Sequence, residues 1–179
     1  VPFAIGSDTG DSIRKPAAYG GIVGYKPTYG RISRYGLFAF ASSLDHLGVF
    51  ARSVKDVSYV MDVVKGHDDK DMTSLPDEDV SYTSELDNDV SGKKLFYIKE
   101  AIEIDNGNNE LKEIISNFKS VLEKCKELGM IVEEVSFDKE LLEAIYPVYN
   151  VISCAEATSN NSNLTGIPFG NRVHSINNK

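Results

Sequence analysis

The sequence contains few of the residues that build disulfide frameworks and metal centres. Only two of its 179 residues are cysteines and three are histidines. Cys125 and Cys154 match neither a zinc-ligand spacing nor a disulfide framework, and we expect free thiols in a cytoplasmic protein. The three histidines are scattered, and none lies at a spacing typical of a ligand pair or a Ser-His dyad. We therefore expect no metal site.

Long apolar runs and an excess of positive charge are absent as well. No run of about eighteen apolar residues occurs, so we expect no membrane span. The start also has no signal-peptide pattern. The formal net charge is −8 at pH 7, and an acidic chain is poorly suited to binding the phosphate backbone of a nucleic acid. If RNA is the final substrate, another subunit must hold it. The acidic segment 67–92 is typical of a solvated surface excursion rather than of a metal site.

A loop rich in glycine, serine and threonine stands out near the start, in the run Ala4-Ile5-Gly6-Ser7-Asp8-Thr9-Gly10-Asp11-Ser12-Ile13-Arg14-Lys15-Pro16-Ala17. Glycines let several backbone N–H groups point into one small space, which suits a negatively charged oxygen. A serine hydroxyl at the end of such a loop is placed to attack a carbonyl group held there. The alternative is a tight turn whose polar side chains cap a helix.

Hydrophobic periodicity predicts an α/β fold. Ser53 and Asp56 form a capping-box pattern before an apolar stripe that runs to Gly66, and we expect this helix to pack on the core. Residues 94–98 and 130–135 have the pattern of strands and flank a helix over 111–128, which predicts a βαβ unit with parallel strands. Asp138 is expected to cap a last long helix that bends near Pro147. Residues 33–41 are expected to form a buried connection with an aromatic girdle.

Three motifs carry a resemblance to a known family. The run Gly6 to Ala17 matches the second half of the amidase-signature motif, and two further motifs follow at the family's spacing: Gly24-Tyr25-Lys26-Pro27-Thr28-Tyr29-Gly30-Arg31 and Ser42-Ser43-Leu44-Asp45-His46-Leu47-Gly48. The chain therefore resembles the amidase-signature family. The sequence of residues 34–45 resembles that of one branch of the family, the A subunits of glutamyl-tRNA(Gln)/aspartyl-tRNA(Asn) amidotransferases. The resemblance is dense from Val1 to about Lys70, thinner in the middle, and returns near 149–157.

The resemblance implies an amidase-signature fold, a mixed sheet flanked by helices, of which this chain holds a part. Enzymes of the family are much longer, and this chain starts with Val1 rather than methionine, so we expect an internal segment of a single domain. Within it we expect a nucleophile-bearing part over 1–66, the surface excursion over 67–92, and the βαβ unit with the long helix over 93–179.

The catalytic roles also follow by resemblance. Ser12 corresponds to the nucleophile that forms an acyl-ester, and the backbone N–H groups of Thr9, Gly10, Asp11 and Ser12 correspond to the oxyanion hole. The family uses a Ser–cis-Ser–Lys arrangement, in which a neutral lysine takes the proton through the bridging serine. That lysine and that serine lie upstream of the motif matched by this chain, so we expect the isolated chain to be inactive.

Three more residues receive roles by resemblance, and Asp11 departs from the family's pattern. Asp8 and Arg14 match positions that brace the loop, and we predict that they pair. Asp11 stands where many relatives have glycine, and we predict that its carboxylate turns away from the oxyanion hole and caps the following turn. Tyr149 matches a tyrosine at the family's glutamine-binding site, although a helix tyrosine packed on the core fits its context equally well.

By resemblance, the complete enzyme releases ammonia from glutamine and works with amidotransferase subunits B and C to amidate Glu-tRNA(Gln) or Asp-tRNA(Asn). The partner would hold the tRNA and use ATP and magnesium, and no cofactor is expected at Ser12. Two alternatives stay open. One is a stand-alone amidase of the same superfamily that acts on small amides, and the other is a non-catalytic module whose loop cradles an anion.

Overall fold

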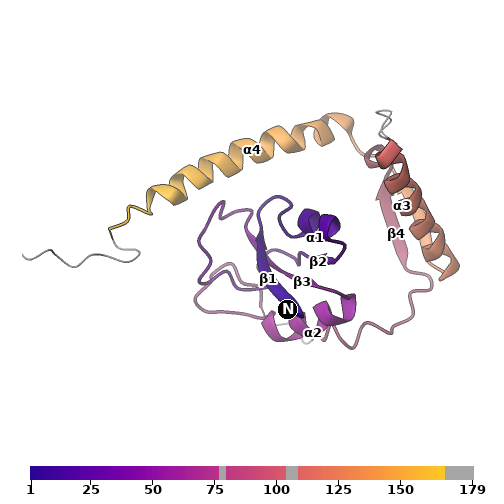
Figure 1. Cartoon of the computed structure of the whole chain (residues 1–179), viewed down its shortest axis with the longest axis horizontal. Helices are drawn as coiled ribbons and strands as arrows, with labels where there is room; N and C mark the ends of the chain where they lie inside the picture. Colours follow the sequence, from indigo (N-terminus) through magenta and orange to yellow (C-terminus); the bar gives the residue numbers. More distant parts are fainter. Residues whose placement is uncertain (77–79, 104–108, 168–179) are drawn as a thin grey trace, which may run out of the picture. The chain divides into compact units, whose positions relative to one another are not determined.

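The computed structural model describes residues 1–76, 80–103 and 109–167. The fold is α/β, as the sequence predicts, and its internal contacts divide the chain into two units (Figure 1). The first unit consists of Val1–Leu86 and Val148–Lys179, and the second of Asp87–Pro147. The division into 1–66, 67–92 and 93–179 stays a prediction.

A three-stranded antiparallel sheet forms the centre of the first unit. Strand β3 (His46–Ala51) lies in the middle, between β1 (Phe3–Asp8) and β2 (Val23–Tyr25). The register places Asp8 opposite His46. The periodicity did not predict these strands, because the second half of β1 consists of residues that strands disfavour. Pairing with a segment 38 to 48 residues away overrides that local preference.

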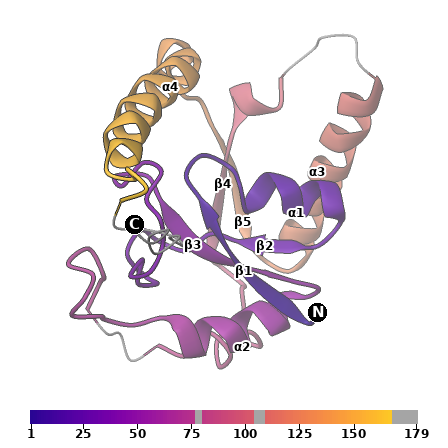
Figure 2. The same ribbon diagram turned by 60° about the vertical axis from the view of Figure 1, so that its left-hand side comes forward.

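Two helices cover opposite faces of this sheet (Figure 2). Alternate residues of a strand point to opposite faces, and Val49 and Ala51 of β3 pack against α2 (Val54–Val64). The buried cluster on this face is completed by Ile32, Val57, Val60 and Met61. Gly48 of the same strand points to the other face, toward the segment that leads into α1 (Arg14–Gly20).

Helix α2 begins as the sequence predicts and ends slightly earlier. The hydroxyl of Ser53 accepts a hydrogen bond from the backbone N–H of Asp56 at 3.1 Å and donates one to its carboxylate at 2.8 Å. The helix ends at Val64, with Lys65 as its C-cap and Gly66 next in line at a φ of 137°. Of the predicted apolar stripe, Val57, Val60 and Met61 are buried, Val64 is partly buried, and the first member, Val54, is exposed.

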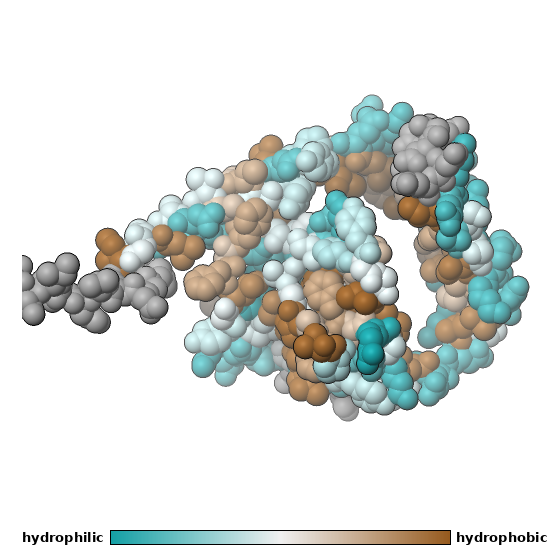
Figure 3. Space-filling view, viewed as in Figure 1, coloured by the Kyte–Doolittle hydropathy of each residue, from teal (hydrophilic) through white to brown (hydrophobic). Residues whose placement is uncertain are grey.

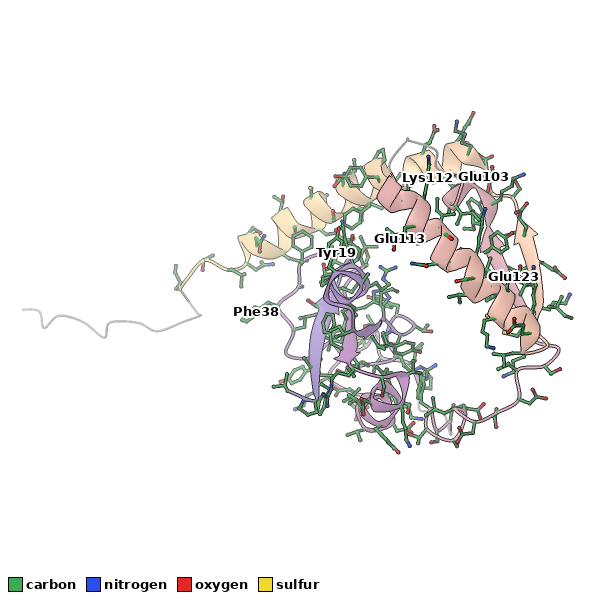
Figure 4. All side chains as sticks on the ribbon, turned by 45° about the vertical axis from the view of Figure 1, so that its right-hand side comes forward. Tyr19, Phe38, Glu103, Lys112, Glu113 and Glu123 are labelled. Atoms are coloured by element: carbon green, nitrogen blue, oxygen red, sulfur yellow. The ribbon has the colours of Figure 1, made fainter. Side chains whose placement is uncertain are left out.

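The prediction of a buried connection over residues 33–41 is wrong. Tyr35, Phe38 and Phe40 are exposed, and Phe38 projects away from the sheet (Figure 4). Polar bonds hold this segment in place of apolar packing. The backbone N–H of Arg34 donates to Asp71 at 2.7 Å and the N–H of Phe40 donates to Asp45 at 2.9 Å.

The second unit is the predicted βαβ arrangement. Strands β4 (Lys94–Ile98) and β5 (Ile131–Val135) pair in parallel, with Lys94 opposite Ile131. A short 3-10 turn, η1 (Lys99–Ala101), follows β4, and helix α3 (Asn109–Glu127) makes the crossover. Leu122 of α3 is buried. The ring of Phe118, on the same helix, packs edge to face against the ring of Tyr97, with the two ring centroids 6.1 Å apart.

Helix α4 (Lys139–Ser162) begins in the second unit and continues into the first. The predicted cap forms, because the Asp138 carboxylate accepts hydrogen bonds from the N–H groups of Glu140 at 2.8 Å and Leu141 at 3.2 Å. Pro147 lies inside the helix. Among the described residues, no helix is both long and apolar enough to cross a membrane.

Apolar side chains remain on the surface of the first unit over the start of β1 and over α2 (Figure 3). A groove of about 380 Å³ lies between these two elements and is lined by Phe3, Tyr59 and Val63 among others. Phe3 and Val63 are exposed in spite of their size. This groove lies on the face of the sheet that α2 covers.

Candidate functional site

The Gly10 loop, residues 9–13, connects β1 to α1 and is anchored by one apolar side chain. Ile13 is 0 % exposed and lies on the sheet face that carries Gly48. A Cβ atom built on Gly48 would lie 2.5 Å from Ile13 Cδ1, and one built on Gly24 would lie 2.5 Å from Ala17 Cβ. Because these two positions carry no side chain, the segment from the loop into α1 packs directly against the backbone of β2 and β3.

Ser12, the residue before this anchor, is exposed. Within residues 1–76, 80–103 and 109–167, no side chain hydrogen-bonds its hydroxyl, and no described group accepts from the N–H groups of residues 9–12. The next N–H group, that of Ile13, donates to Asp8 at 3.1 Å. Four successive amide donors are thus left for an oxygen from outside the chain, which suits an oxyanion. The nucleophile and oxyanion-hole assignments stay predictions.

The pair predicted between Asp8 and Arg14 is formed. The Asp8 side chain is 1 % exposed, and its two oxygens accept from Arg14 Nε and Nη2, each at 3.2 Å. Nη2 of Arg14 also donates to the carbonyl of Gly10. The pair therefore joins the end of β1, the loop and the start of α1, as its predicted bracing role requires.

Burial alone would raise the pKa of Asp8. The hydrogen bonds from Arg14 and from the Ile13 N–H, together with the positive charge of Arg14, outweigh burial and hold the pKa of this carboxyl below its usual value. Asp8 is therefore ionised at neutral pH, and its charge is balanced by one guanidinium.

Asp11 follows part of its prediction. Its carboxylate lies 3.2 Å from Lys15 Nζ, one turn along the chain, and both side chains are more than half exposed. The carboxylate therefore pairs with an ammonium group of α1, whereas the sequence predicted a backbone N–H group. The Asp11 carbonyl oxygen accepts from the Lys15 N–H at 2.9 Å. No non-glycine residue among those described has a positive φ, so Asp11 fits this turn without strain.

Asp45 is a residue of the site that sequence reasoning missed. It is 2 % exposed, and its carboxylate accepts from the hydroxyl of Thr9 at 2.5 Å. The same carboxylate accepts from the N–H groups of Phe40 at 2.9 Å and Ala41 at 3.2 Å. It belongs to one of the matched motifs, but a motif does not reveal that an acid is buried beneath a loop.

Tyr149 of α4 lies against the Gly10 loop. A Cβ atom built on Gly10 would lie 2.8 Å from the Tyr149 Oη and 2.9 Å from its Cζ. The tyrosine hydroxyl is therefore beside the loop that carries Ser12, instead of packing in the core cluster. Its assignment to glutamine binding stays a prediction. A side chain at position 10 would require the tyrosine ring to shift.

Replacing Arg14 with alanine in the complete protein is expected to lower the kcat of the amide hydrolysis predicted at Ser12 about 10- to 100-fold. A displacement of the loop by about 1 Å is enough to cause a loss of that size. Folding should be retained, since Arg14 is half exposed. Steady-state assays and the yield of assembled complex check this. Arg52→Ala, a change at an exposed arginine just after β3, is the control. Unchanged kcat in Arg14→Ala would contradict the bracing role.

Comparisons with known proteins agree with one another. The family model described as Amidase matches residues 1–179. The A subunit of glutamyl-tRNA(Gln) amidotransferase from Staphylococcus aureus (strain MRSA252) is 48% identical over 170 residues, which cover 95% of this chain and 34% of that protein. The chain thus spans about a third of the length of the curated relatives it matches.

Two crystal structures extend the comparison. The structure of the A subunit of glutamyl-tRNA(Gln) amidotransferase from Thermotoga maritima superposes with a TM-score of 0.80 at 41% identity, over 92% of this chain and 35% of that one. Native peptide amidase from Stenotrophomonas maltophilia superposes with a TM-score of 0.76 at 26% identity, over 93% of this chain and 33% of that one. The fold is thus shared by proteins with different named activities.

Proposed function

Because this chain belongs to the amidase family, we propose that the complete protein hydrolyses the side-chain amide of glutamine at Ser12 and passes the ammonia to a tRNA-dependent amidotransferase reaction. The observation that carries the proposal is the juxtaposition of three features. An exposed Ser12 is the last of four successive residues whose N–H groups have no acceptor among the described residues, and Tyr149 lies against the same loop. The similarity to the A subunits of amidotransferases supports glutamine as the amide.

The reaction divides into two steps on one oxygen atom. Ser12 Oγ forms a bond to the amide carbon of glutamine and loses its proton to a base, after which the C–N bond breaks and the nitrogen leaves as ammonia with one added proton. Water then attacks the ester, which releases glutamate and restores the serine hydroxyl. The oxygen that becomes negative in each step lies toward the N–H groups of residues 9–12, which are fixed before the reaction starts.

Asp8 and Asp45 hold the loop and do not take part in either step. Each carboxylate is buried and accepts hydrogen bonds from the loop or its neighbours. A base for Ser12 is expected upstream of Val1, where the family places its lysine and bridging serine. Partner subunits B and C would hold the tRNA, ATP and magnesium, and the acidic character of this chain supports leaving the tRNA to a partner.

The test is an assay of the complete protein with and without its partner subunits. We expect ammonia release from glutamine to rise when the partners are added, and added hydroxylamine to trap γ-glutamyl hydroxamate from the ester on Ser12. Acetamide and other small aliphatic amides serve as comparison substrates. Hydrolysis of small amides without preference for glutamine, and without dependence on partners, would favour a stand-alone amidase. Absence of any ester on Ser12 would favour an anion-binding module.

A further inference from the structure

One face of helix α4 is directed at the first unit. Its members recur at helical spacing and are Tyr149, Ser153, Glu156, Ala157 and Asn160. Ser153 and Ala157 are buried, so the middle of this face is packed against the unit. The polar members on either side of them make specific contacts.

Glu156 is bonded to a single serine by both of its oxygens. Its Oε2 accepts from the backbone N–H of Ser43 at 2.9 Å, and its Oε1 accepts from the Ser43 hydroxyl at 2.5 Å. One turn later, Asn160 Nδ2 donates to the carbonyl of Phe40 at 3.1 Å and lies 3.2 Å from Ser42 Oγ. Two bonds to one carboxylate fix orientation as well as distance. The helix is thus tied to residues 40–45, which we call the Asp45 loop.

The Asp45 loop is also tied to the Gly10 loop. Asp45 holds its own loop through the N–H groups of Phe40 and Ala41 and holds the other loop through the hydroxyl of Thr9. The carboxylates of Glu156 and Asp45 therefore both bind the same six-residue segment, one from α4 and one from within it. Any displacement of α4 is transmitted to the position of Tyr149 relative to Thr9 and Gly10.

Tyr149 and Glu156 are seven residues apart on α4, which is about two turns and about 10.5 Å along the helix axis. Tyr149 fills the space over Gly10, while Glu156 makes its bonds at the Asp45 loop. Because the helix is rigid over this span, anchoring Glu156 at one end sets the position of Tyr149 at the other. The Tyr149 hydroxyl makes no hydrogen bond to any described residue, so it is placed by the helix.

We propose that Glu156 is a positioning residue for the substrate: by binding Ser43 it sets helix α4 on the Asp45 loop and so places the Tyr149 hydroxyl beside the Gly10 loop, where it meets glutamine. The inference rests on the proposed function, because it assigns Tyr149 to the bound glutamine. Glu156 acts through Tyr149 and touches neither the substrate nor Ser12.

The test compares Glu156→Ala, Glu156→Gln and Ser43→Ala in the complete complex. Glu156→Ala is expected to raise the KM for glutamine about five- to tenfold, since it removes two bonds to a charged acceptor. Glu156→Gln keeps one oxygen acceptor and Ser43→Ala keeps the N–H donor, so both should have smaller effects. The matched control is Glu143→Ala, whose carboxylate is on the same helix and forms an ion pair with Lys139 at 3.6 Å.

Two further measurements separate positioning from general stability. The rate at which phenylmethylsulfonyl fluoride labels Ser12 should stay within about twofold of wild type, because this small reagent needs the nucleophile and no contact with Tyr149. In a Tyr149→Ala background, adding Glu156→Ala should raise the KM no further, because residues that act as one unit are not additive. A merely structural role would lower Tm and slow labelling equally in both backgrounds.

The outcomes are distinct. Unchanged KM in Glu156→Ala, or the same fold-change with and without Tyr149, would overturn the inference while leaving glutamine hydrolysis intact. A wild-type complex that hydrolyses no glutamine would overturn the proposed function and the inference together. A raised KM that disappears in the Tyr149→Ala background, with normal Ser12 labelling, supports the inference.

Discussion

Replacing Ser12 with alanine is expected to lower kcat for glutamine hydrolysis by about 10⁴-fold or more in the complete protein, because no other group supplies the attacking oxygen. The KM should change little, since the amide donors of residues 9–12 and the ring of Tyr149 remain in place. The same variant should give no γ-glutamyl hydroxamate when hydroxylamine is added. Steady-state kinetics and mass spectrometry of the trapped product check both expectations.

Ser120→Ala is the matched control for this variant. Ser120 is on α3, and its hydroxyl donates to the carbonyl of Asn117 within the helix, so its removal should leave kcat unchanged. If Ser12→Ala kept more than a tenth of wild-type kcat, Ser12 would not be the nucleophile.

Replacing Asp8 with asparagine is expected to lower the free energy of unfolding of the complete protein by about 2–3 kcal/mol at pH 7. Breaking one partner of a fully buried ion pair costs about 3–5 kcal/mol, and the cost is smaller for this pair because Arg14 is half exposed. Activity should fall as well, because Asp8 holds both Ile13 and Arg14. Urea denaturation and steady-state assays measure the two effects.

The difference in unfolding free energy between wild type and Asp8→Asn is expected to become smaller at acidic pH. The pKa of Asp8 is lower in the folded protein than its ordinary value of 3.8, since the bonds from Arg14 and Ile13 outweigh the cost of burial. A carboxyl with a depressed folded pKa contributes stability above its unfolded pKa and loses it as the pH falls through the folded value. The difference between wild type and Asp8→Asn should therefore be constant from pH 7 to about pH 5 and shrink below about pH 4.

Asp87→Asn, a change at an exposed aspartate, controls for the loss of one negative charge. It should leave the unfolding free energy nearly unchanged at every pH. A difference between wild type and Asp8→Asn that grows below pH 4 would contradict a lowered pKa of Asp8 in the folded protein. A double variant with Arg14→Ala would show whether the two side chains contribute as a pair.

Much of the second unit could be predicted from the sequence because its signals are local. The strands at 94–98 and 131–135 and the helix between them match the expected βαβ unit, and the cap at Asp138 forms as expected. In the first unit, the cap at Ser53 also forms as expected. Apolar periodicity and capping side chains depend on residues within a few positions of one another. The same local reasoning failed for β1, whose residues pair with β3 residues 38 to 48 positions away.

The aromatic residues of 33–41 show a second limit of local reasoning. Their apolar side chains suggested burial, but Tyr35 and Phe38 are exposed and buried carboxylates hold the segment instead. Nothing near Asp45 or Asp71 in the sequence shows that these acids lie beneath a loop. Burial of a charge depends on donors contributed by distant segments, such as Thr9 for Asp45.

The sequence by itself determined the family, the candidate nucleophile Ser12 and the pairing of Asp8 with Arg14, because these depend on a short contiguous motif. Only the tertiary structure decided what lies against that motif. It placed Asp45 beneath Thr9, Tyr149 over Gly10 and Glu156 on Ser43. These contacts join segments up to about 140 residues apart, and no local pattern encodes which distant side chain fills the space that a glycine leaves open.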